Sequence, residues 1–573
     1  MLQTLTTPRG ETLSGTPWQV YPRPQMRRDS YINLNGEWDF AVSSGNPETF
    51  DMRILVPFCP ESRPSGIGRH FEEGAPLWYR RRFLLPEGFR RERVLLHIGA
   101  ADQIAEVFVN GQHLCRHEGG YASFCVDITE ALAEENELVI RCTDDLHDQA
   151  FPYGKQVMNR GGMWYTPVSG IWQTVWLESV PGTYIENLNI ENHGASVTIS
   201  TVPPLDGTVS VEQLGQFPLE NGQVTIAPEN PHFWCPDDPY LYRFTVETAQ
   251  DKVESYFAIR SLEIKKVGGY PRLCLNGKPY FFHGLLDQGY WPEGLLTAPA
   301  PESYADDILA MKRLGFNTLR KHIKVEPEEF YYQCDRLGMI VWQDMVNNGS
   351  YSYFRDTVLP TIGIQKRNDR RLHRDERSRN TFRQGAADAV KQLKNHPCIC
   401  YWTIFNEGWG QFDSDRVCGW FRTLDATRFI DTTSGWFRGK NTDVDSRHQY
   451  FGKLRLEGDG LRPLVLSEFG GKTWQVEGHI FNPDKTYGYG ACPTREALNE
   501  AVAALYRESI VPAVEKGLCA AIYTQVSDVE DEVNGLITYD RRVVKLDADT
   551  MLPISRALQD AMEKTVASFE KMG

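Results

Sequence analysis

The most restrictive feature of this sequence is an alternation of helix and strand patterns through its second half. Residues 303–314 (SYADDILAMKRL) carry apolar side chains at helical spacing, Gly315 ends that helix, and residues 317–322 (NTLRKH) have a strand pattern. The same order recurs with helices predicted at 327–337, 381–394 and 495–516, and strands at 339–344, 398–406 and 519–525. Such alternation over about 300 residues indicates parallel strands covered by helices, and favours a (β/α)8 barrel over an open sheet.

The first part of the chain has a different pattern, that of antiparallel β-structure. Short alternating runs are separated by Gly, Pro, Asn and Asp, as where Val107-Phe108-Val109 precedes the turn-forming pair Asn110-Gly111. A second β region, at about 183–265, is divided by proline-rich breaks, which is typical of a small sandwich. We therefore predict a β domain at residues 1–182, a β-sandwich at 183–267 and the barrel at 268–573.

Composition narrows the class of protein. The net charge of the 573 residues is -15, and the chain has no basic block interleaved with aromatic residues, which argues against a nucleic-acid partner. The first ten residues lack a signal-peptide pattern and there is no run of 18 apolar residues, so we expect a cytoplasmic protein without a membrane partner. The 12 cysteines are dispersed, which indicates buried reduced thiols and gives no sign of structural zinc.

Two carboxylates end predicted buried strands. Asn406-Glu407 follows the apolar run CICYWTIF, and Glu468 follows the run PLVLS. The carboxyl ends of barrel strands form the face that handles substrate, although a single glutamate there is as well explained by a surface ion pair. Two facing carboxyls are what acetal cleavage requires, since one protonates the departing oxygen and the other attacks or stabilises the anomeric carbon.

Short motifs are spread along the chain in addition to the two carboxylates. They are NLNGEWDF at 33–40, VPFCPES at 56–62, WYRRRF at 78–83, VNGQHLCRHEGGYASFCVD at 109–127, SGIWQTVWLE at 169–178, FWCPDDPYLY at 233–242, FAIRSLEI at 257–264 and LNGKP at 275–279. Together these motifs resemble glycoside hydrolase family 2, which includes β-galactosidases, β-glucuronidases and β-mannosidases. The resemblance implies an N-terminal jelly-roll domain, an immunoglobulin-like β-sandwich and a catalytic TIM barrel, and it covers nearly the whole chain.

The resemblance also implies roles for individual residues. Glu407 matches the family's acid/base, Glu468 its nucleophile, and Asn406 the residue that binds the sugar 2-hydroxyl. These matches imply retention of anomeric configuration through a covalent glycosyl-enzyme. His322 matches a histidine that contacts the glycone, but it lies in RKHIK where the commoner family run is Arg-x-Ser-His-Tyr-Pro, and Tyr450 matches a tyrosine that binds the nucleophile.

Further candidates for substrate binding combine polar groups with aromatic faces, as sugar sites do. Core packing is the alternative for the aromatic ones. The loop around residues 148–160 is long enough to suggest an excursion toward the barrel mouth. The candidates are Asp287, Trp436, Gln525, and, from that loop, Lys155 and Gln156.

The sequence does not identify the sugar that the protein recognises. Asn276-Gly277-Lys278 resembles the Asn-x-Lys motif of glucuronidases, but it belongs to LNGKP, which other members carry. We favour a β-galactosidase-type exo-hydrolase acting on a small carbohydrate or glycoconjugate, with a β-glucuronidase or another β-glycosidase as the alternative. A non-catalytic carbohydrate-binding protein on the same scaffold is a third reading. We expect no cofactor, with magnesium or sodium left open, and a homo-oligomer is compatible with the sequence.

Overall fold

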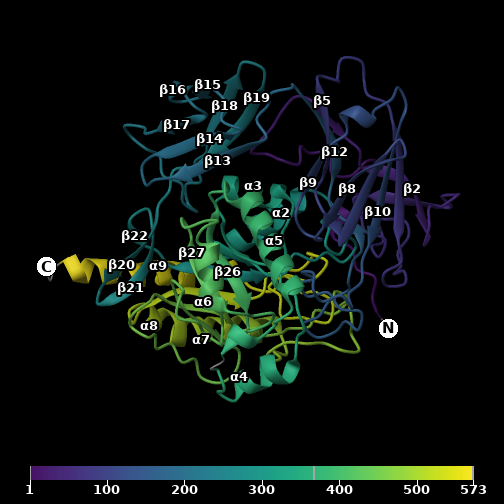
Figure 1. The fold of residues 1–573 in the computed structure, drawn as a ribbon. Coiled ribbons are helices and arrows are strands. Elements are labelled where there is room, and N and C mark those ends of the chain that lie inside the picture. Colours follow the sequence, from purple (N-terminus) through teal and green to yellow (C-terminus); the bar gives the residue numbers. More distant parts are fainter. Residues whose placement is uncertain (1, 366–367, 571–573) are drawn as a thin grey trace.

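The computed structural model describes residues 2–365 and 368–570, which form three β-rich parts (Figure 1). Two β-sandwiches lie beside each other, and the barrel lies below them in this view. The multidomain architecture predicted from the sequence is confirmed.

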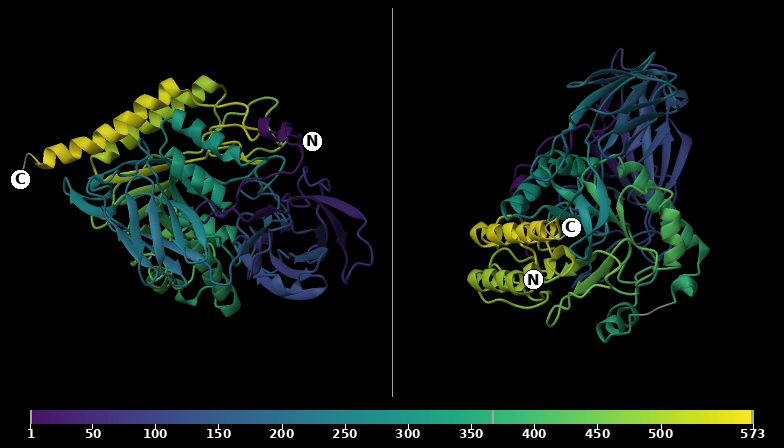
Figure 2. Two further views of the ribbon diagram at one scale, coloured as in Figure 1. Left: turned by 90° about the horizontal axis from the view of Figure 1, so that it is seen from above. Right: turned by 90° about the vertical axis from the view of Figure 1, so that its left-hand side faces the viewer.

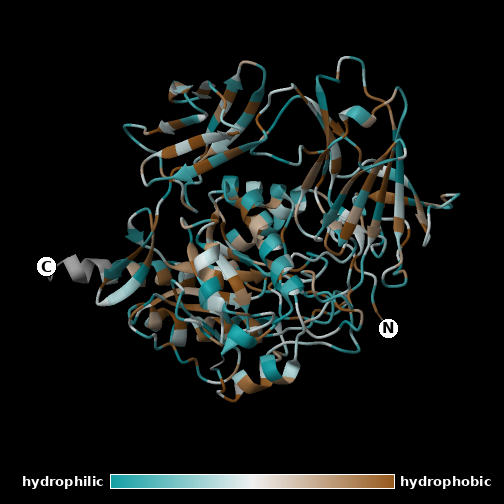
Figure 3. Cartoon of the chain, viewed as in Figure 1, coloured by the Kyte–Doolittle hydropathy of each residue, from teal (hydrophilic) through white to brown (hydrophobic). Residues whose placement is uncertain are grey.

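The N-terminal part is an antiparallel sandwich with a shared apolar core. Strand β10 (Asn136–Thr143) alternates strictly between buried and half-buried positions, because successive side chains of a strand point to opposite faces. The same banding is visible along these strands in Figure 3. The six-stranded sheet is β3 (Met52–Val56), β2 (Gly36–Val42), β4 (Leu77–Phe83), β10, β7 (Ile104–Val109) and β8 (Gln112–Glu118), and the four-stranded sheet is β1 (Tyr31–Asn33), β12 (Val175–Val180), β5 (Arg93–Ile98) and β9 (Phe124–Asp127).

Short elements complete this part. Strands β6 (Ala101–Asp102) and β11 (Gly170–Ile171) pair with each other, and a helical turn, η1, spans Thr129–Ala131. Helix α1 (Pro8–Glu11) lies against the barrel instead, since Arg9 pairs with Asp306 at 2.8 Å.

The middle part is a smaller sandwich of two antiparallel sheets around its own core. Its sheets are β13 (Asn187–Asn192), β14 (Val197–Val202) and β17 (Gln223–Ile226), and β16 (Gly215–Leu219), β15 (Gly207–Val211), β18 (Tyr242–Thr248) and β19 (Lys252–Phe257). A three-stranded antiparallel sheet then leads into the barrel, formed by β20 (Leu262–Val267), β21 (Tyr270–Leu275) and β22 (Lys278–Pro279).

A buried arginine joins the two sandwiches. Arg28 pairs with Glu178 at 3.1 Å and with Asp251 at 2.6 Å, and Arg23 reaches Glu178 at 3.1 Å. Burial alone would raise the pKa of Glu178, but the charges of Arg23 and Arg28 together with a hydrogen bond from His97 outweigh burial and hold that pKa below its usual range. Glu178 is therefore ionised and depends on these cations.

The barrel is built from eight parallel strands. The order of neighbours is β27 (Phe429–Ser434), β26 (Ile399–Asn406), β25 (Ile340–Asp344), β24 (Thr318–Lys321), β23 (Phe282–Asp287), β30 (Leu518–Thr524), β29 (Leu464–Phe469) and β28 (Asp445–Gln449). The ring is nearly closed: β27 and β28, at the two ends of this order, are linked through the hydroxyls of Ser434 and Ser446 at 3.3 Å. Every residue of β26 is buried, as expected for a parallel strand covered on both faces.

Helices cover the outside of the barrel, and Figure 2 shows α9 running along it. The helices predicted at 303–314 and 327–337 are confirmed to within one residue, whereas the one predicted at 381–394 begins earlier, at Glu376, and the one predicted at 495–516 is interrupted at Tyr506–Ile510. The helices are α2 (Glu302–Arg313), α3 (Glu328–Leu337), α4 (Leu359–Thr361), α5 (Glu376–Leu393), α6 (Ser414–Phe421), α7 (Arg495–Leu505), α8 (Val511–Val514) and α9 (Ala548–Glu570), with shorter helical turns at Phe354–Val358, Asp369–Arg371 and Tyr506–Ile510. The last of these turns has π geometry and joins α7 to α8, where Pro512 lacks the N–H that an α-helix would use.

Candidate active site

Residues at the carboxyl ends of several barrel strands converge on one pocket. Asn406 ends β26 and Glu407 follows it, Glu468 is the fifth residue of β29, and His322 and Tyr450 follow β24 and β28. All five line the same pocket, as does Lys155 from the N-terminal part. The pocket walls also include Trp164, Tyr351, Trp409, Tyr489 and Glu532, none of which was predicted from the sequence.

The two strand-end carboxylates face each other. An oxygen of Glu407 and an oxygen of Glu468 lie within 4.8 Å of each other. Glu407 has a left-handed backbone conformation, with φ at 53°, which is uncommon for a residue with a side chain and recurs at functional sites. The arrangement allows both carboxyl groups to reach one bond of a ligand.

The environment of Glu468 keeps this carboxyl ionised. Burial would raise its pKa, but the Arg320 guanidinium and a hydrogen bond from the Tyr450 hydroxyl help to hold that pKa below its usual range. Arg320, whose charge is permanent, donates from Nη1 to Glu468 Oε1 at 3.0 Å. Glu468 is therefore a buried anion at neutral pH, which suits a nucleophile better than a proton donor.

Arg320 connects most of the polar groups in the pocket floor. Its side chain is fully buried, and it pairs with Asp344 at 2.9 Å and donates to Asn406 Oδ1 at 2.9 Å. Since the oxygen of the Asn406 amide is used in this way, its NH2 group is left to face a ligand. The sequence analysis did not identify Arg320 or Asp344 as part of the site.

His322 is held in its neutral form. Burial, followed by the positive charge of Lys155, lowers the pKa of His322 to about 4. Its Nδ1 lies 2.7 Å from Asp344 Oδ2, so the neutral ring donates from Nδ1 and presents Nε2 as an acceptor. A sugar hydroxyl is the kind of donor that such a nitrogen binds.

His448 was also missed by the sequence analysis, although it lies directly beside both carboxylates. Its Nδ1 is 2.7 Å from Glu407 Oε1, and its Nε2 is 3.6 Å from Glu468 Oε1. A signal was available, because His448 lies two residues before the predicted Tyr450, and side chains two residues apart in an extended segment point to the same face. The signal was weak because β28 (DSRHQ) is polar and does not resemble a buried strand.

Four predicted residues do not line this pocket, which corrects their placement. Their polar atoms are used elsewhere, in contacts that a sequence cannot show. Asp287 binds Lys321 Nζ at 2.7 Å, and the Gln525 amide donates to Asn534 at 2.8 Å. The Gln156 amide donates to Tyr121 at 2.8 Å, and Trp436 lies behind Glu407, donating to its carbonyl oxygen at 3.1 Å.

Lys155 reaches the pocket because its loop is anchored on the barrel. The Tyr153 hydroxyl donates to the Gly349 carbonyl at 2.8 Å, and Arg160 pairs with Asp531 at 2.9 Å. The Lys155 ammonium lies 5.9 Å from the ring centre of Tyr165. In the part of the chain that the structure describes, the Lys155 ammonium has no ion-pair partner and no hydrogen-bond acceptor. An unneutralised positive charge therefore borders the pocket.

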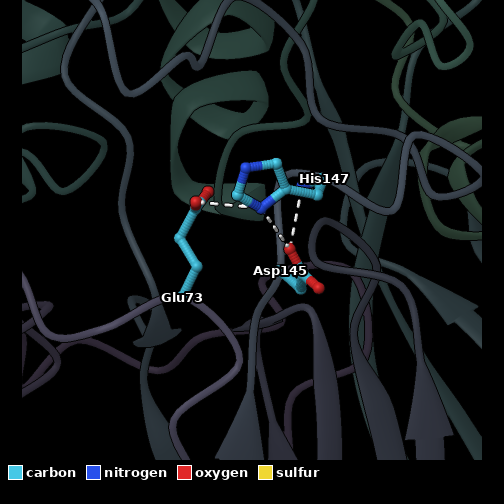
Figure 4. A group of neighbouring side chains, drawn as sticks. All are labelled: Glu73, Asp145 and His147. Atoms are coloured by element: carbon cyan, nitrogen blue, oxygen red, sulfur yellow. Dashed lines mark hydrogen bonds and ion pairs between the residues drawn. The ribbon is translucent and has the colours of Figure 1, made fainter.

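Within the described ranges, two groups of side chains have a geometry that could hold a metal ion. One is Glu407, His448 and Glu468 in the pocket, and the other is Glu73, Asp145 and His147 on the N-terminal part. In the second group, His147 Nδ1 lies 3.0 Å from Glu73 and 3.1 Å from Asp145, and 79% of the His147 side chain is exposed (Figure 4). This is the geometry of a surface ion pair, which needs no metal to explain it. None of the described helices is long and apolar enough to span a membrane.

Three family models match the chain in the order of its parts. The model described as the glycosyl hydrolase 2 galactose-binding domain-like matches residues 70–160, the one described as glycosyl hydrolases family 2 matches residues 183–260, and the family's TIM barrel domain matches residues 267–485. The architecture and the sequence patterns therefore agree on one family.

Curated relatives are distant. A β-galactosidase of Thermoanaerobacter pseudethanolicus is 23% identical over 65% of this chain and 49% of its own length. A β-glucuronidase of Bacteroides fragilis is 22% identical over 66% of this chain and 56% of its own length. The chain thus spans about half the length of these curated relatives.

Solved structures share the whole fold. A β-glucuronidase from an uncultured Clostridium species superposes with a TM-score of 0.71 at 19% identity, covering 96% of this chain and all of that one (100%). A β-galacturonidase from Eisenbergiella tayi, solved with galacturonate, gives a TM-score of 0.67 at 17% identity, with coverage of 95% and 99%.

Proposed function

The chain belongs to glycosyl hydrolase family 2, and on that basis we propose that it is a retaining, exo-acting β-glycoside hydrolase with Glu468 as nucleophile and Glu407 as acid/base. The observation that carries this proposal is the approach of the two carboxylates to within 4.8 Å. Retaining enzymes hold such groups about 5–5.5 Å apart, whereas inverting enzymes leave room for a water between them.

The reaction has two displacements. In the first, Glu407 gives its proton to the departing oxygen while a Glu468 oxygen attacks the anomeric carbon, so the glycosidic bond breaks and a glycosyl ester forms. In the second, a water molecule gives its proton to Glu407 and attacks the same carbon, which breaks the ester and releases the sugar. Both steps use the chain's own side chains and water.

The other pocket residues suit a single sugar ring. The Asn406 NH2 group is placed to bind the 2-hydroxyl, and His322 Nε2 to accept from another hydroxyl. Trp164 and Trp409, whose ring centres are 5.1 Å apart, offer the apolar surface that sugar rings pack against. Loops from both the barrel and the N-terminal part border the pocket, which supports exo rather than endo action.

For the glycone, we propose an acidic sugar. The sequence-based preference for a β-galactoside leaves the Lys155 ammonium without a partner, whereas the carboxylate of a β-glucuronide or β-galacturonide would supply one. The relatives named above support either choice, since their names include a galactosidase, glucuronidases and a galacturonidase. A neutral β-galactoside is the second candidate.

The test is hydrolysis of a panel of aryl β-glycosides by the wild type, Glu468→Gln and Glu407→Ala. We expect Glu468→Gln to lose nearly all activity, and Glu407→Ala to form a β-glycosyl azide from an activated substrate when azide is present. Glu477→Gln, an exposed glutamate in the chain segment that follows β29, is the matched control and should retain full activity. Equal rates for Glu468→Gln and the wild type would contradict the proposal and favour a non-catalytic carbohydrate-binding protein.

A further inference from the structure

His448 is enclosed by polar groups from four barrel strands. Its Nδ1 faces Glu407, while its Nε2 faces Arg320 Nη1 at 3.3 Å and the Ser434 hydroxyl at 3.0 Å. The side chain is fully buried. The titratable and charged groups that face the ring are Glu407 from the end of β26, Glu468 from β29 and Arg320 from β24.

The contact with Arg320 favours one tautomer of the neutral His448 ring. A guanidinium group can only donate hydrogen bonds, so the contact with Arg320 Nη1, which also donates to Ser467 O and Glu468 Oε1 at 3.0 Å, favours a lone pair on the nitrogen that faces it, Nε2. The neutral ring then carries its hydrogen on Nδ1, and Nδ1–H donates to Glu407 Oε1.

The ring has little room to turn away from this orientation. Gly435 has φ at +89°, and a Cβ atom added there would lie 2.8 Å from His448 Cγ, so the backbone packs directly against the imidazole. On another side, the Trp436 ring lies edge-on with its centre 5.6 Å away. The hydrogen bond to Glu407 is therefore made by a fixed donor.

We propose that His448 is a positioning residue for Glu407: by binding Oε1, it reserves Oε2 for the proton that passes to and from the substrate. This inference rests on the proposed function. In the first displacement the proton leaves Glu407 Oε2 for the aglycone oxygen, while Oε1 keeps the hydrogen bond from Nδ1. In the second, the same Oε2 takes a proton from water, so the carboxyl group need not rotate between the two steps.

The role can be tested by how strongly the rate depends on the leaving group. We compare kcat/KM of the wild type, His448→Phe and His448→Asn for 2,4-dinitrophenyl and phenyl β-glycosides of the accepted sugar. A dinitrophenolate leaves without protonation, so His448→Phe should stay within about threefold of the wild type on that substrate. On the phenyl glycoside it should fall by about 10- to 100-fold, a part of the 10²–10⁴-fold that general acid catalysis contributes.

The conservative variant distinguishes positioning from packing. The amide NH2 of Asn can occupy the place of Nδ1–H, so His448→Asn should recover most of the phenyl glycoside rate. An equal loss on both substrates in His448→Phe, or no loss on the phenyl glycoside, would overturn the proposal.

A second measurement does not depend on activity. A neutron crystal structure of the wild type at neutral pH should show deuterium on Nδ1 of His448 and none on Nε2. Deuterium on Nε2 would refute the inference even if the protein proved to be a glycosidase. Conversely, the expected deuterium position together with inactivity on every β-glycoside would leave the His448 geometry standing and contradict the proposed function.

Discussion

Replacing Lys155 with methionine should reduce activity on acidic glycosides selectively. Two unit charges 4 Å apart attract by about 4 kcal/mol at the effective dielectric of a site near the surface. Desolvation and ordering of the side chain reduce a hydrogen bond between charged groups to about 1.5–3 kcal/mol. Because Lys155 borders the pocket and is half-buried, we expect kcat/KM for a 4-nitrophenyl β-uronide to fall by about 10- to 150-fold.

The assay compares 4-nitrophenyl β-glucuronide and β-galacturonide with the neutral β-glucoside and β-galactoside at one pH. Lys155→Met should leave the neutral substrates within about threefold of the wild type, and Lys155→Arg, which keeps the charge, should retain most of the preference for acids. If Lys155→Met lost the same fraction of kcat/KM on acidic and neutral substrates, Lys155 would contribute to the shape of the pocket and not to recognition of a substrate carboxylate. A wild type that prefers neutral glycosides would refute the assignment of an acidic glycone.

Two further predictions concern buried charges. Arg320→Met leaves Asp344 and Glu468 without their cation, so the free energy of unfolding should fall by about 3–5 kcal/mol. Arg320→Lys keeps a positive charge and should be destabilised less. Thermal and urea unfolding would measure both variants, and equal stability of the two would contradict the prediction. Because the folded-state pKa of Glu178 is depressed, its stabilising effect should be complete above about pH 5 and be lost as the pH falls further. Glu178→Gln should therefore be destabilised at neutral pH and show a weaker loss on acidification, and parallel pH profiles of the two proteins would contradict this.

The features that the sequence predicted depend on local pattern. The continuous apolar run before Asn406-Glu407 identified a buried parallel strand and placed these residues at its carboxyl end. Glu468 was found for the same reason, because β29 is also buried throughout. Helix bounds followed from the spacing of apolar side chains and from residues such as Gly338, which ends α3 in a left-handed conformation.

The features that the sequence did not predict depend on which polar atoms meet in three dimensions. Asp287 and Gln525 stand at strand ends as Glu468 does, yet their side chains are taken up by Lys321 and Asn534. His448 lies on a strand that lacks the apolar signature, so no periodicity marks the side it faces. Such pairings are set by strand register around the barrel, which a linear pattern does not encode.

The loop that carries Lys155 is anchored on the barrel but belongs to the N-terminal part. Bond cleavage and selection of the sugar are therefore assigned to different parts of the chain. The atoms proposed to break the bond belong to the barrel, whereas the charge proposed to choose the sugar comes from the N-terminal sandwich. Removing the excursion would take this charge away from the pocket, while Glu407 and Glu468 would stay on the barrel strands. Grafting the corresponding excursion from another chain of this architecture is thus a direct route to a new sugar preference without altering the two carboxyl groups.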